Sequence, residues 1–167
     1  MARLQVGEMI PPFALPTRGG QLRTGDFKQR RNLVLVFQPK DCPGCVALLD
    51  ALAVSYPAYR ELEAQVVVVR RREPPAALSE RLPFPVAWDE AGDVFEAFAG
   101  RDEKGKSRPT VYVTDRFGEV AFIRDGAGPE VAEEVLATLE FVEKACPECN
   151  TVAWGWDEVA KESGSRA

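Results

Sequence analysis

The chain has 167 residues, of which 46% are hydrophobic and 28% are charged, so its size and composition fit one globular domain with a substantial core. Its 26 acidic and 21 basic residues give a net charge of −5, which argues against a nucleic-acid-binding surface. It has four cysteines and no histidine, which excludes Cys/His metal sites and Cys–His nucleophile pairs and makes the cysteines the candidates for catalysis or metal binding.

Hydrophobic segments that would direct the chain to a membrane are missing from the sequence. The N-terminal stretch MARLQVGEMIPPF lacks the apolar run of a signal peptide, and no stretch approaches the roughly 20 apolar residues of a membrane-spanning helix. We therefore expect a cytoplasmic protein with no membrane partner.

The first third of the chain predicts a hairpin, a buried strand and a helix. The pieces FALPT and GQLRT flank Gly19 and Gly20 and predict a short hairpin. The apolar run at 32–37 predicts a strand buried on both faces. Apolar residues at helical spacing predict a helix over 46–65, which Pro57 is expected to kink or interrupt.

The rest of the chain alternates between the two kinds of element. We expect a strand at 66–70, a short helix at 73–82, a strand at 84–88 and a helix at 90–100. The runs TVYVTD and EVAFIRD predict two strands joined by a turn at Phe117 and Gly118, and the last helix is expected at 129–145.

This order of elements predicts an α/β fold with a mixed central sheet and helices on both faces. The hairpin forms an N-terminal extension of that fold. We assign residues 1–145 to this domain and residues 146–167 to a C-terminal tail that contains a second CxxC motif.

The first CxxC motif, in QPKDCPGC, lies where the buried strand turns into the first long helix. Backbone N–H groups and the helix dipole stabilise a thiolate at such a helix start, and the thiolate is the reactive form of cysteine. Pro43 suits the first helical position, so we expect an exposed Cys42 at the N-cap and Cys45 one turn inside the helix. This placement favours a redox-active dithiol over a zinc site or two merely buried cysteines.

The second motif, in KACPECN, places Cys146 and Cys149 directly after the last predicted helix. The pair is predicted to be an auxiliary dithiol that exchanges electrons with Cys42 and Cys45. A zinc ion shared by the two motifs is disfavoured, because roughly 100 residues separate them, far more than in compact zinc ribbons. The sequence is also compatible with a local disulfide, with a site completed by a partner subunit, or with no role for this pair.

Arg70, Arg71 and Arg72 follow a predicted parallel strand. Ligands bind beyond the carboxyl ends of such strands in open α/β sheets, so a ligand contact is one interpretation of the three arginines. A solvated run of charges is the favoured interpretation.

Several motifs carry a family resemblance. The stretch LVLVFQPKDCPGC resembles the strand-to-CxxC segment of thioredoxin-like proteins, and SRPTVYVTDRFGEVAF (107–122) is similar to the segment in which these proteins place a cis proline opposite the cysteines. The opening VGEMIPPFALPTRGGQLRTGDF resembles the redoxin branch, which comprises the alkyl hydroperoxide reductase/thiol-specific antioxidant (peroxiredoxin) proteins and related thiol–disulfide reductases. The resemblance covers about residues 4–145 and implies a thioredoxin-like fold.

The resemblance implies a thiol–disulfide oxidoreductase that needs no cofactor or metal and belongs to the cell's redox homeostasis. In this interpretation Cys42 attacks the substrate, Cys45 resolves the mixed disulfide, and Pro109 is the cis proline facing them. Pro39, Arg108 and Thr110 are the candidate substrate contacts. The implied partners are a disulfide- or peroxide-containing substrate and a thiol reductant, and the oligomeric state is not specified.

A peroxiredoxin-like thiol peroxidase with Cys45 as its peroxidatic cysteine is the second interpretation. Peroxiredoxins have a Pro-x-x-x-Thr/Ser-x-x-Cys loop, and PKDCPGC is one residue shorter, with Cys42 in the place of the threonine. Pro109 stands where the peroxide-binding arginine is expected, with Arg108 beside it. These departures favour disulfide exchange, and a non-enzymatic zinc-binding or adaptor module is the third interpretation.

Overall fold

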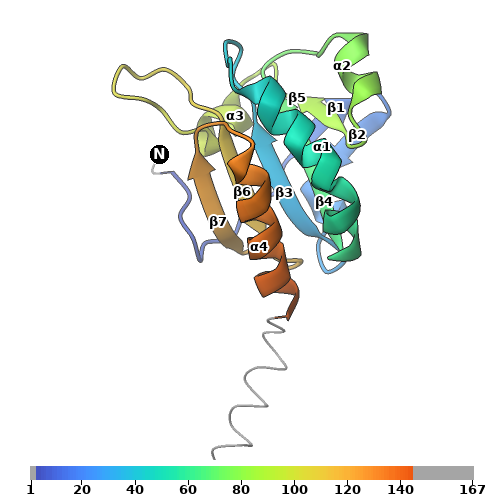
Figure 1. Cartoon of the computed structure of the whole chain (residues 1–167). Helices are drawn as coiled ribbons and strands as arrows, with labels where there is room; N and C mark the ends of the chain where they lie inside the picture. The colour runs from blue at the N-terminus through green and yellow to red at the C-terminus, as the bar shows by residue number, and fades with distance from the viewer. Residues whose placement is uncertain (1–2, 145–167) are drawn as a thin grey trace, which may run out of the picture.

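The computed structural model describes residues 3–144, and residues 1–2 and 145–167 lie outside the description. Within the described part, seven strands form one sheet in the order β2-β1-β5-β4-β3-β6-β7 (Figure 1). The strands are β1 (Ala14–Thr17), β2 (Gly20–Arg23), β3 (Asn32–Phe37), β4 (Ala64–Arg70), β5 (Val86–Trp88), β6 (Thr110–Thr114) and β7 (Val120–Asp125). The helices are α1 (Cys45–Glu61), α2 (Ala76–Arg81), α3 (Asp93–Phe98) and α4 (Glu130–Lys144), with a 3-10 helix η1 at Thr24–Asp26.

The sheet is parallel at its centre and antiparallel at its margins. β3, β4 and β5 run parallel to one another, whereas β6, β7, β1 and β2 are antiparallel to their neighbours. Every residue of β3 is buried, as expected for a strand covered on both faces. The carboxyl ends of the three parallel strands therefore meet at one edge of the sheet, and the CPGC segment follows β3 at that edge.

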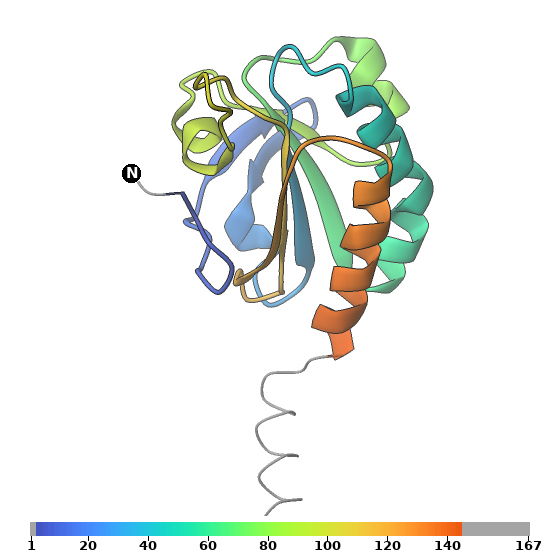
Figure 2. The same ribbon diagram turned by 60° about the vertical axis from the view of Figure 1, so that its left-hand side comes forward.

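Helices cover both faces of the sheet, which confirms the predicted fold class. α1 and α4 pack on one face, and α3 lies with the N-terminal segment on the other (Figure 2). The two faces take alternate residues of the strands, so Val34 and Val36 face α1 whereas Leu35 and Phe37 face α3. The predicted N-terminal hairpin is present as β1 and β2.

The first long helix differs from its prediction at both ends. It begins at Cys45 and ends at Glu61, and β4 already begins at Ala64, although the sequence predicted helix through residue 65. Two residues after the helix ends, Glu63 has a positive φ of 55°, and the chain turns there into β4. The carbonyl of Glu63 then accepts the N–H of Asn32 at 2.8 Å, which aligns β4 with the start of β3.

Pro57 lies inside α1, and the helix continues through it, so the predicted interruption of the helix is wrong. Proline removes one backbone hydrogen bond from a helix. Here the exposed ring faces solvent, while the flanking residues Leu52, Tyr56 and Tyr59 are buried against the core. Tertiary packing on both sides of Pro57 therefore holds the helix together.

The remaining elements agree with their predictions in type and order, although α2, α3 and β5 are shorter than predicted. No helix within residues 3–144 is long and apolar enough to cross a membrane. The boundary assigned at residue 145 and the tail from residue 146 onward lie outside the described residues.

Candidate active site

Cys42 and Cys45 form a disulfide at the start of α1, with their Cα atoms 5.4 Å apart. The N–H of Cys45 donates to the carbonyl of Cys42 at 3.2 Å, which closes a turn through Pro43 and Gly44. Two cysteines three residues apart in such a turn have the spacing that a disulfide requires. The predicted placement of the cysteine pair at a helix start is therefore present in the structure, with the two cysteines joined in a disulfide.

The helix start lies later than predicted. Gly44, not Cys42, is the N-cap residue, and its carbonyl accepts the N–H of Leu48 at 3.1 Å. Cys45 is thus the first helical residue, rather than lying one turn inside. The reason is that the turn at Pro43 and Gly44 precedes the first hydrogen bond of the helix.

The two sulfur-bearing residues differ in accessibility. Cys45 has no exposed surface, whereas Cys42 is partly exposed. Burial by the core explains the difference, because Cys45 precedes Leu48 and Leu49 on the side of α1 that packs on the sheet. A reactant approaching from solvent therefore meets Cys42 first.

The disulfide loop packs against the turn between β7 and α4. A Cβ atom added at Gly44 would lie 3.1 Å from the Cβ atom of Ala127, so the two backbones approach closely there. The neighbouring Gly126 donates its N–H to the carbonyl of Pro109 at 2.8 Å. The CPGC turn and Pro109 thus flank the same 126–127 turn.

Sheet register places the other predicted site residues at this edge as well. Thr110 pairs with Phe37, the last residue of β3, so Pro109 and Arg108 lie beside the segment that leads to Cys42. Pro39 is buried within that segment. Cys146 and Cys149 lie outside the described residues.

The Arg108–Pro109 peptide bond is trans, because no cis peptide bond occurs within residues 3–144. The prediction that Pro109 is a cis proline is therefore wrong. Hydrogen bonds hold the backbone on either side of the bond: the N–H of Arg108 donates to the carbonyl of Gly100 at 2.7 Å, and the carbonyl of Pro109 accepts from Gly126. Both contacts are made with the trans bond, which X–Pro pairs generally prefer.

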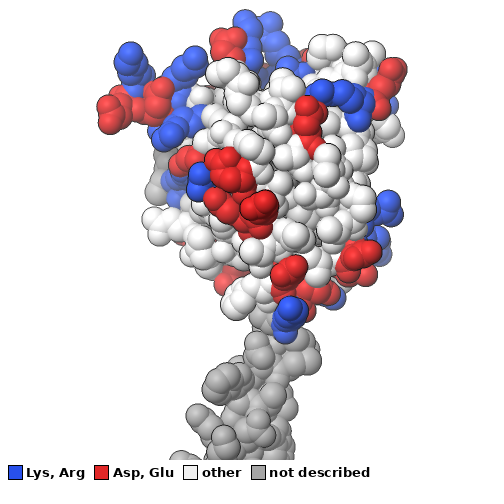
Figure 3. Space-filling model, viewed as in Figure 1, with Lys and Arg blue, Asp and Glu red and all other residues white. Residues whose placement is uncertain are grey.

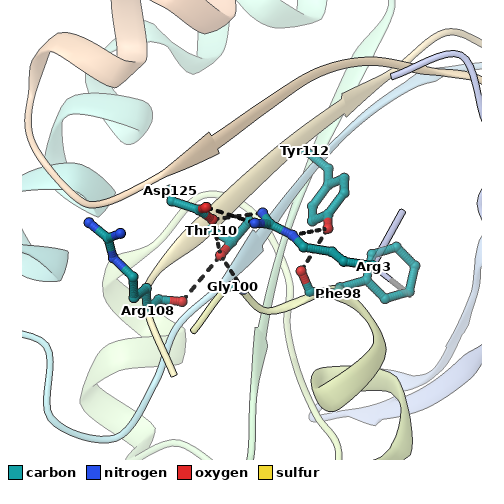
Figure 4. Close-up of polar contacts among 7 residues, drawn as sticks. All are labelled: Arg3, Phe98, Gly100, Arg108, Thr110, Tyr112 and Asp125. Atoms are coloured by element: carbon teal, nitrogen blue, oxygen red, sulfur yellow. Dashed lines mark hydrogen bonds and ion pairs between the residues drawn. The ribbon is translucent and has the colours of Figure 1, made fainter. Parts of the chain in front are cut away.

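A polar network holds this edge of the sheet together (Figure 4). Arg3 donates two hydrogen bonds of 2.7 Å to the carboxylate of Asp125 and one of 3.2 Å to the hydroxyl of Tyr112. The buried hydroxyl of Thr110 accepts the N–H of Gly100 at 2.9 Å and lies 3.0 Å from Oδ1 of Asp125. The N-terminal segment is thereby joined to the residues that follow Pro109.

Hydrogen bonds within this network stabilise the charged forms of Arg3 and Asp125. Burial by itself would raise the pKa of Asp125, but hydrogen bonds from Arg3 and Thr110 outweigh it and hold that pKa below its ordinary value. The hydrogen bond to Asp125 raises the pKa of Arg3. Burial raises the pKa of Tyr112 in spite of its hydrogen bond from Arg3. The ion pair is therefore charged at neutral pH.

The sequence did not identify Arg3, Tyr112 or Asp125. Arg3 and Asp125 are 122 residues apart, and neither belongs to a motif. Tyr112 appeared only as a strand residue, and its hydroxyl donates to the carbonyl of Phe98 at 2.7 Å. Only the pairing of β6 with β7 and the path of the N-terminal segment bring these groups together, so no local signal was available.

The end of α4 lies far from the disulfide. Glu143 accepts hydrogen bonds from Asn32 at 2.9 Å and from Arg116 at 2.6 Å, which places it beside the amino end of β3. The disulfide follows the carboxyl end of β3, and Figure 1 shows α4 running from one end of the sheet to the other. Within residues 3–144, no three His, Cys, Asp or Glu side chains are grouped for metal binding.

Solved structures share this fold. The chain is similar to the peroxidoxin BcpB of Mycobacterium tuberculosis, with 24% identity and a TM-score of 0.72 over 84% of this chain and 99% of that one. It is similar to a Chlorobium tepidum protein described as a candidate thiol:disulfide interchange protein, DsbE, with 23% identity and a TM-score of 0.69 over 84% and 99%. It is also similar to a mutant of PrxQ from Xylella fastidiosa, with 18% identity and a TM-score of 0.73 over 84% and 98%.

These structural similarities establish the thioredoxin-like fold. A comparison with curated proteins finds no significant match. The sequence model described as the AhpC/TSA family matches residues 6–123, which include the whole CPGC segment and the strand after Pro109. This match over most of the chain, together with the cysteine pair at the start of α1, shows that the protein belongs to the AhpC/TSA family of thiol oxidoreductases and peroxidases.

Proposed function

We propose that the protein is a thiol–disulfide oxidoreductase in which Cys42 attacks and Cys45 resolves. The observation that carries this assignment is the unequal exposure of the two cysteines, since Cys42 is partly exposed and Cys45 has no exposed surface. Disulfide exchange requires one sulfur to be reached by the substrate and the other to be reached only by its partner. The Cα separation of 5.4 Å supports rapid closure of the internal disulfide.

The exchange takes place in two steps. The thiolate of Cys42 attacks one sulfur of the substrate disulfide, a mixed disulfide forms, and the other substrate sulfur leaves as a thiolate that takes a proton from solvent. The thiolate of Cys45 then attacks Sγ of Cys42, which releases the second substrate thiol. The substrate gains two electrons and the cysteine pair loses two; an external thiol reductant returns them by the reverse exchange.

The neighbouring residues are proposed to position the substrate. Pro39 lies within the segment before Cys42 and Pro109 lies beside that segment, and neither offers a backbone N–H that would need a partner there. Thr110 is held by the Asp125 network, which fixes the start of β6. Arg108 supplies a cation next to Pro109 that an anionic substrate group can approach.

We further propose that the protein works in the cytoplasm, where low-molecular-weight thiols keep such pairs reduced, and that it contributes there to redox homeostasis. Residues 1–145 form the catalytic domain in this proposal, and Cys146 and Cys149 act as an auxiliary dithiol of the tail. The electron donor belongs to the class of thiol reductants.

A trapping experiment tests the assignment in a Cys146→Ser/Cys149→Ser background, which leaves only the core pair. The Cys45→Ser variant, incubated with insulin disulfides, should accumulate a mixed disulfide through Cys42, because the resolving thiol is missing. The matched Cys42→Ser variant should accumulate little. Intact-protein and peptide mass spectrometry identify the bond.

The same variants, exposed to a hydroperoxide, test the alternative that the protein is a peroxidase. If Cys42→Ser forms a sulfenic acid on Cys45 and reacts with peroxide as fast as the wild type, the chain is a peroxidase that uses Cys45. One tightly bound zinc per reduced chain that is lost with the cysteines would instead indicate a zinc-binding module.

A further inference from the structure

A row of side chains lies on the α1 side of the sheet at the edge that carries the disulfide. Arg70 ends β4, and strand alternation places it on the same face as Val66 and Val68, which pack in the α1 core. Gln38 follows β3, and its N–H continues the ladder by donating to the carbonyl of Val69 at 2.9 Å. Gln38 therefore lies beside Arg70.

The same row continues on the other side of Gln38. Val36 pairs with Val68 of β4 and with Val111 of β6, so two residues further on Gln38 has Arg70 on one side and Pro109 on the other. Gln38 is four residues before Cys42. Arg70 and Pro109 thus flank the residue from which the disulfide loop departs.

Polar atoms of this row are buried without partners. Nη1 of Arg70 and Oε1 of Gln38 make no hydrogen bond within the described part of the chain. No ion pair of Arg70 occurs among residues 3–144 either. A buried guanidinium N–H without an acceptor costs free energy, and burial also lowers the pKa of Arg70.

The carboxylates near Arg70 either accept other hydrogen bonds or line an exposed recess of the surface. Asp89 accepts the N–H groups of Gly92 and Phe95, at 3.0 and 2.9 Å. Glu73 and Glu90 line a surface recess with the exposed arginines that follow Arg70 in the chain. None of these carboxylates pairs with Arg70 in the described structure, so its charge is available to an incoming anion.

The charge distribution on this side of the molecule agrees with an anionic ligand. Figure 3 shows most of the Lys and Arg side chains of this face at the end that carries the disulfide loop, and acidic side chains over α4. Acidic side chains lie among the basic ones at that end as well. The basic side chains at the disulfide end attract an anion, whereas the acidic side chains over α4 repel it.

We propose that Arg70 binds a carboxylate of the disulfide that exchanges with Cys42, so that the preferred substrates are disulfides with a carboxylate close to the sulfurs. The proposal rests on the exchange activity proposed above. A planar guanidinium matches a carboxylate with two parallel hydrogen bonds, which a lysine does not provide. Arg70 as a whole is partly exposed, so the carboxylate binds it from the solvent side and holds the substrate sulfurs at the edge where Cys42 is exposed.

A charge series of small disulfides tests this proposal with the reduced protein. The probes are 3,3′-dithiodipropionate with two carboxylates, bis(2-hydroxyethyl) disulfide with none, and cystamine with two ammonium groups. The leaving thiols of these probes differ in pKa, so each rate constant is divided by that of the same disulfide with dithiothreitol. The normalised rate constants for oxidation of the core pair should decrease in that order in the wild type. Arg70→Gln should lower the rate with dithiodipropionate about tenfold and change the rate with the neutral disulfide less than twofold, as expected for one charge-assisted contact.

Arg72→Gln is the matched control, because it removes the same charge from an exposed residue two positions away. Arg72→Gln should change the rate with dithiodipropionate less than threefold, and only at low salt. The reason is that about 0.5 M salt screens the attraction of distant charges but not a direct contact. Equal losses in Arg72→Gln and Arg70→Gln would overturn the proposal in favour of general attraction. Equal losses of Arg70→Gln with all three disulfides would also overturn it.

Two further arms complete the test. Peptide disulfides that differ only in Glu or Gln beside the half-cystine distinguish a peptide carboxylate from that of a small molecule, since only a site open to peptides prefers the Glu form. If Arg70→Gln does not fold, an absent preference for dithiodipropionate in the normalised rate constants of the wild type at 0.5 M salt still overturns the proposal. Failure of the wild type with every disulfide would instead overturn the proposed exchange activity itself.

Discussion

Arg3 holds Asp125 through two hydrogen bonds of 2.7 Å, although the two residues are 122 positions apart. Asp125 is the last residue of β7 and is followed by Gly126, whose N–H binds the carbonyl of Pro109. The N-terminal segment therefore supports the edge of the sheet that carries the disulfide. Both side chains are about one third exposed, at 33% and 31%, so solvent weakens the attraction to about 1 kcal/mol.

Replacing Asp125 with Asn should lower the free energy of unfolding by about 1 kcal/mol at pH 7. The folded-state pKa of Asp125 lies below its ordinary value of about 3.9, so this contribution is present above that value and is lost as the pH falls through the folded-state pKa. The stability difference between wild type and Asp125→Asn should therefore shrink below about pH 4. Urea unfolding between pH 3 and 7 measures it, with the exposed Asp26→Asn as control. A difference that is constant with pH would contradict the assignment.

Replacing Gly44 with Ala should destabilise the oxidised protein by about 1 kcal/mol. The added Cβ would lie 3.1 Å from the Cβ atom of Ala127 and 3.3 Å from its carbonyl oxygen, so the 126–128 turn would have to move. Gly25→Ala is the control, because a Cβ there meets nothing within 4 Å. Thermal unfolding of both variants should show a loss only for Gly44→Ala; equal melting temperatures would show that the turn yields freely.

Replacing Tyr59 with Phe should cost about 1 kcal/mol, because the buried hydroxyl donates to the carbonyl of Ala132 at 2.7 Å. Burial raises the pKa of Tyr59 to about 12, against a small opposing effect of Ser55. The unfolded chain loses this proton near pH 10, so the stabilisation is complete below about pH 10 and decreases as the pH rises toward 12. The wild type should therefore lose more stability than Tyr59→Phe between pH 9 and 11. Parallel curves over that range would contradict the prediction.

Replacing Pro57 with Ala should stabilise the protein by about 1 kcal/mol or more. Alanine restores a backbone N–H inside α1, and the side chain at this position is exposed, so no core contact is lost. Urea unfolding measures the gain, and Val54→Ala, at another exposed position of α1, controls for general helix propensity. A loss of stability in Pro57→Ala would show that the proline determines the path of α1.

The order and type of the elements could be predicted because each is encoded locally. The run at 32–37 is apolar without interruption and forms the buried β3. The position of CPGC between this strand and α1 likewise predicted a closed cysteine pair at a helix start. Local pattern was sufficient wherever neighbouring residues decide the structure.

Predictions were wrong where contacts between segments far apart in the sequence determine the local structure. Pro57 stays inside α1 because residues on the buried side of the helix pack on the sheet, and Pro109 stays trans among hydrogen bonds from other segments. The Arg3 and Asp125 pair was missed because neither residue carries a pattern. Arg70 was noticed in a charge run, but only strand register separates it from its exposed neighbours.

The direction of α4 sets the reaction order of any exchange between the two cysteine motifs. The 15 residues of the helix span about 22 Å, from the disulfide end of the sheet to the opposite end. Two residues reach at most about 7 Å and five about 18 Å, so the length of α4 favours exchange between the CPEC motif of one molecule and the CPGC motif of another over exchange within one molecule. Electron transfer from the CPEC motif to the CPGC motif should therefore be mainly bimolecular, and its rate should then rise with the square of the protein concentration.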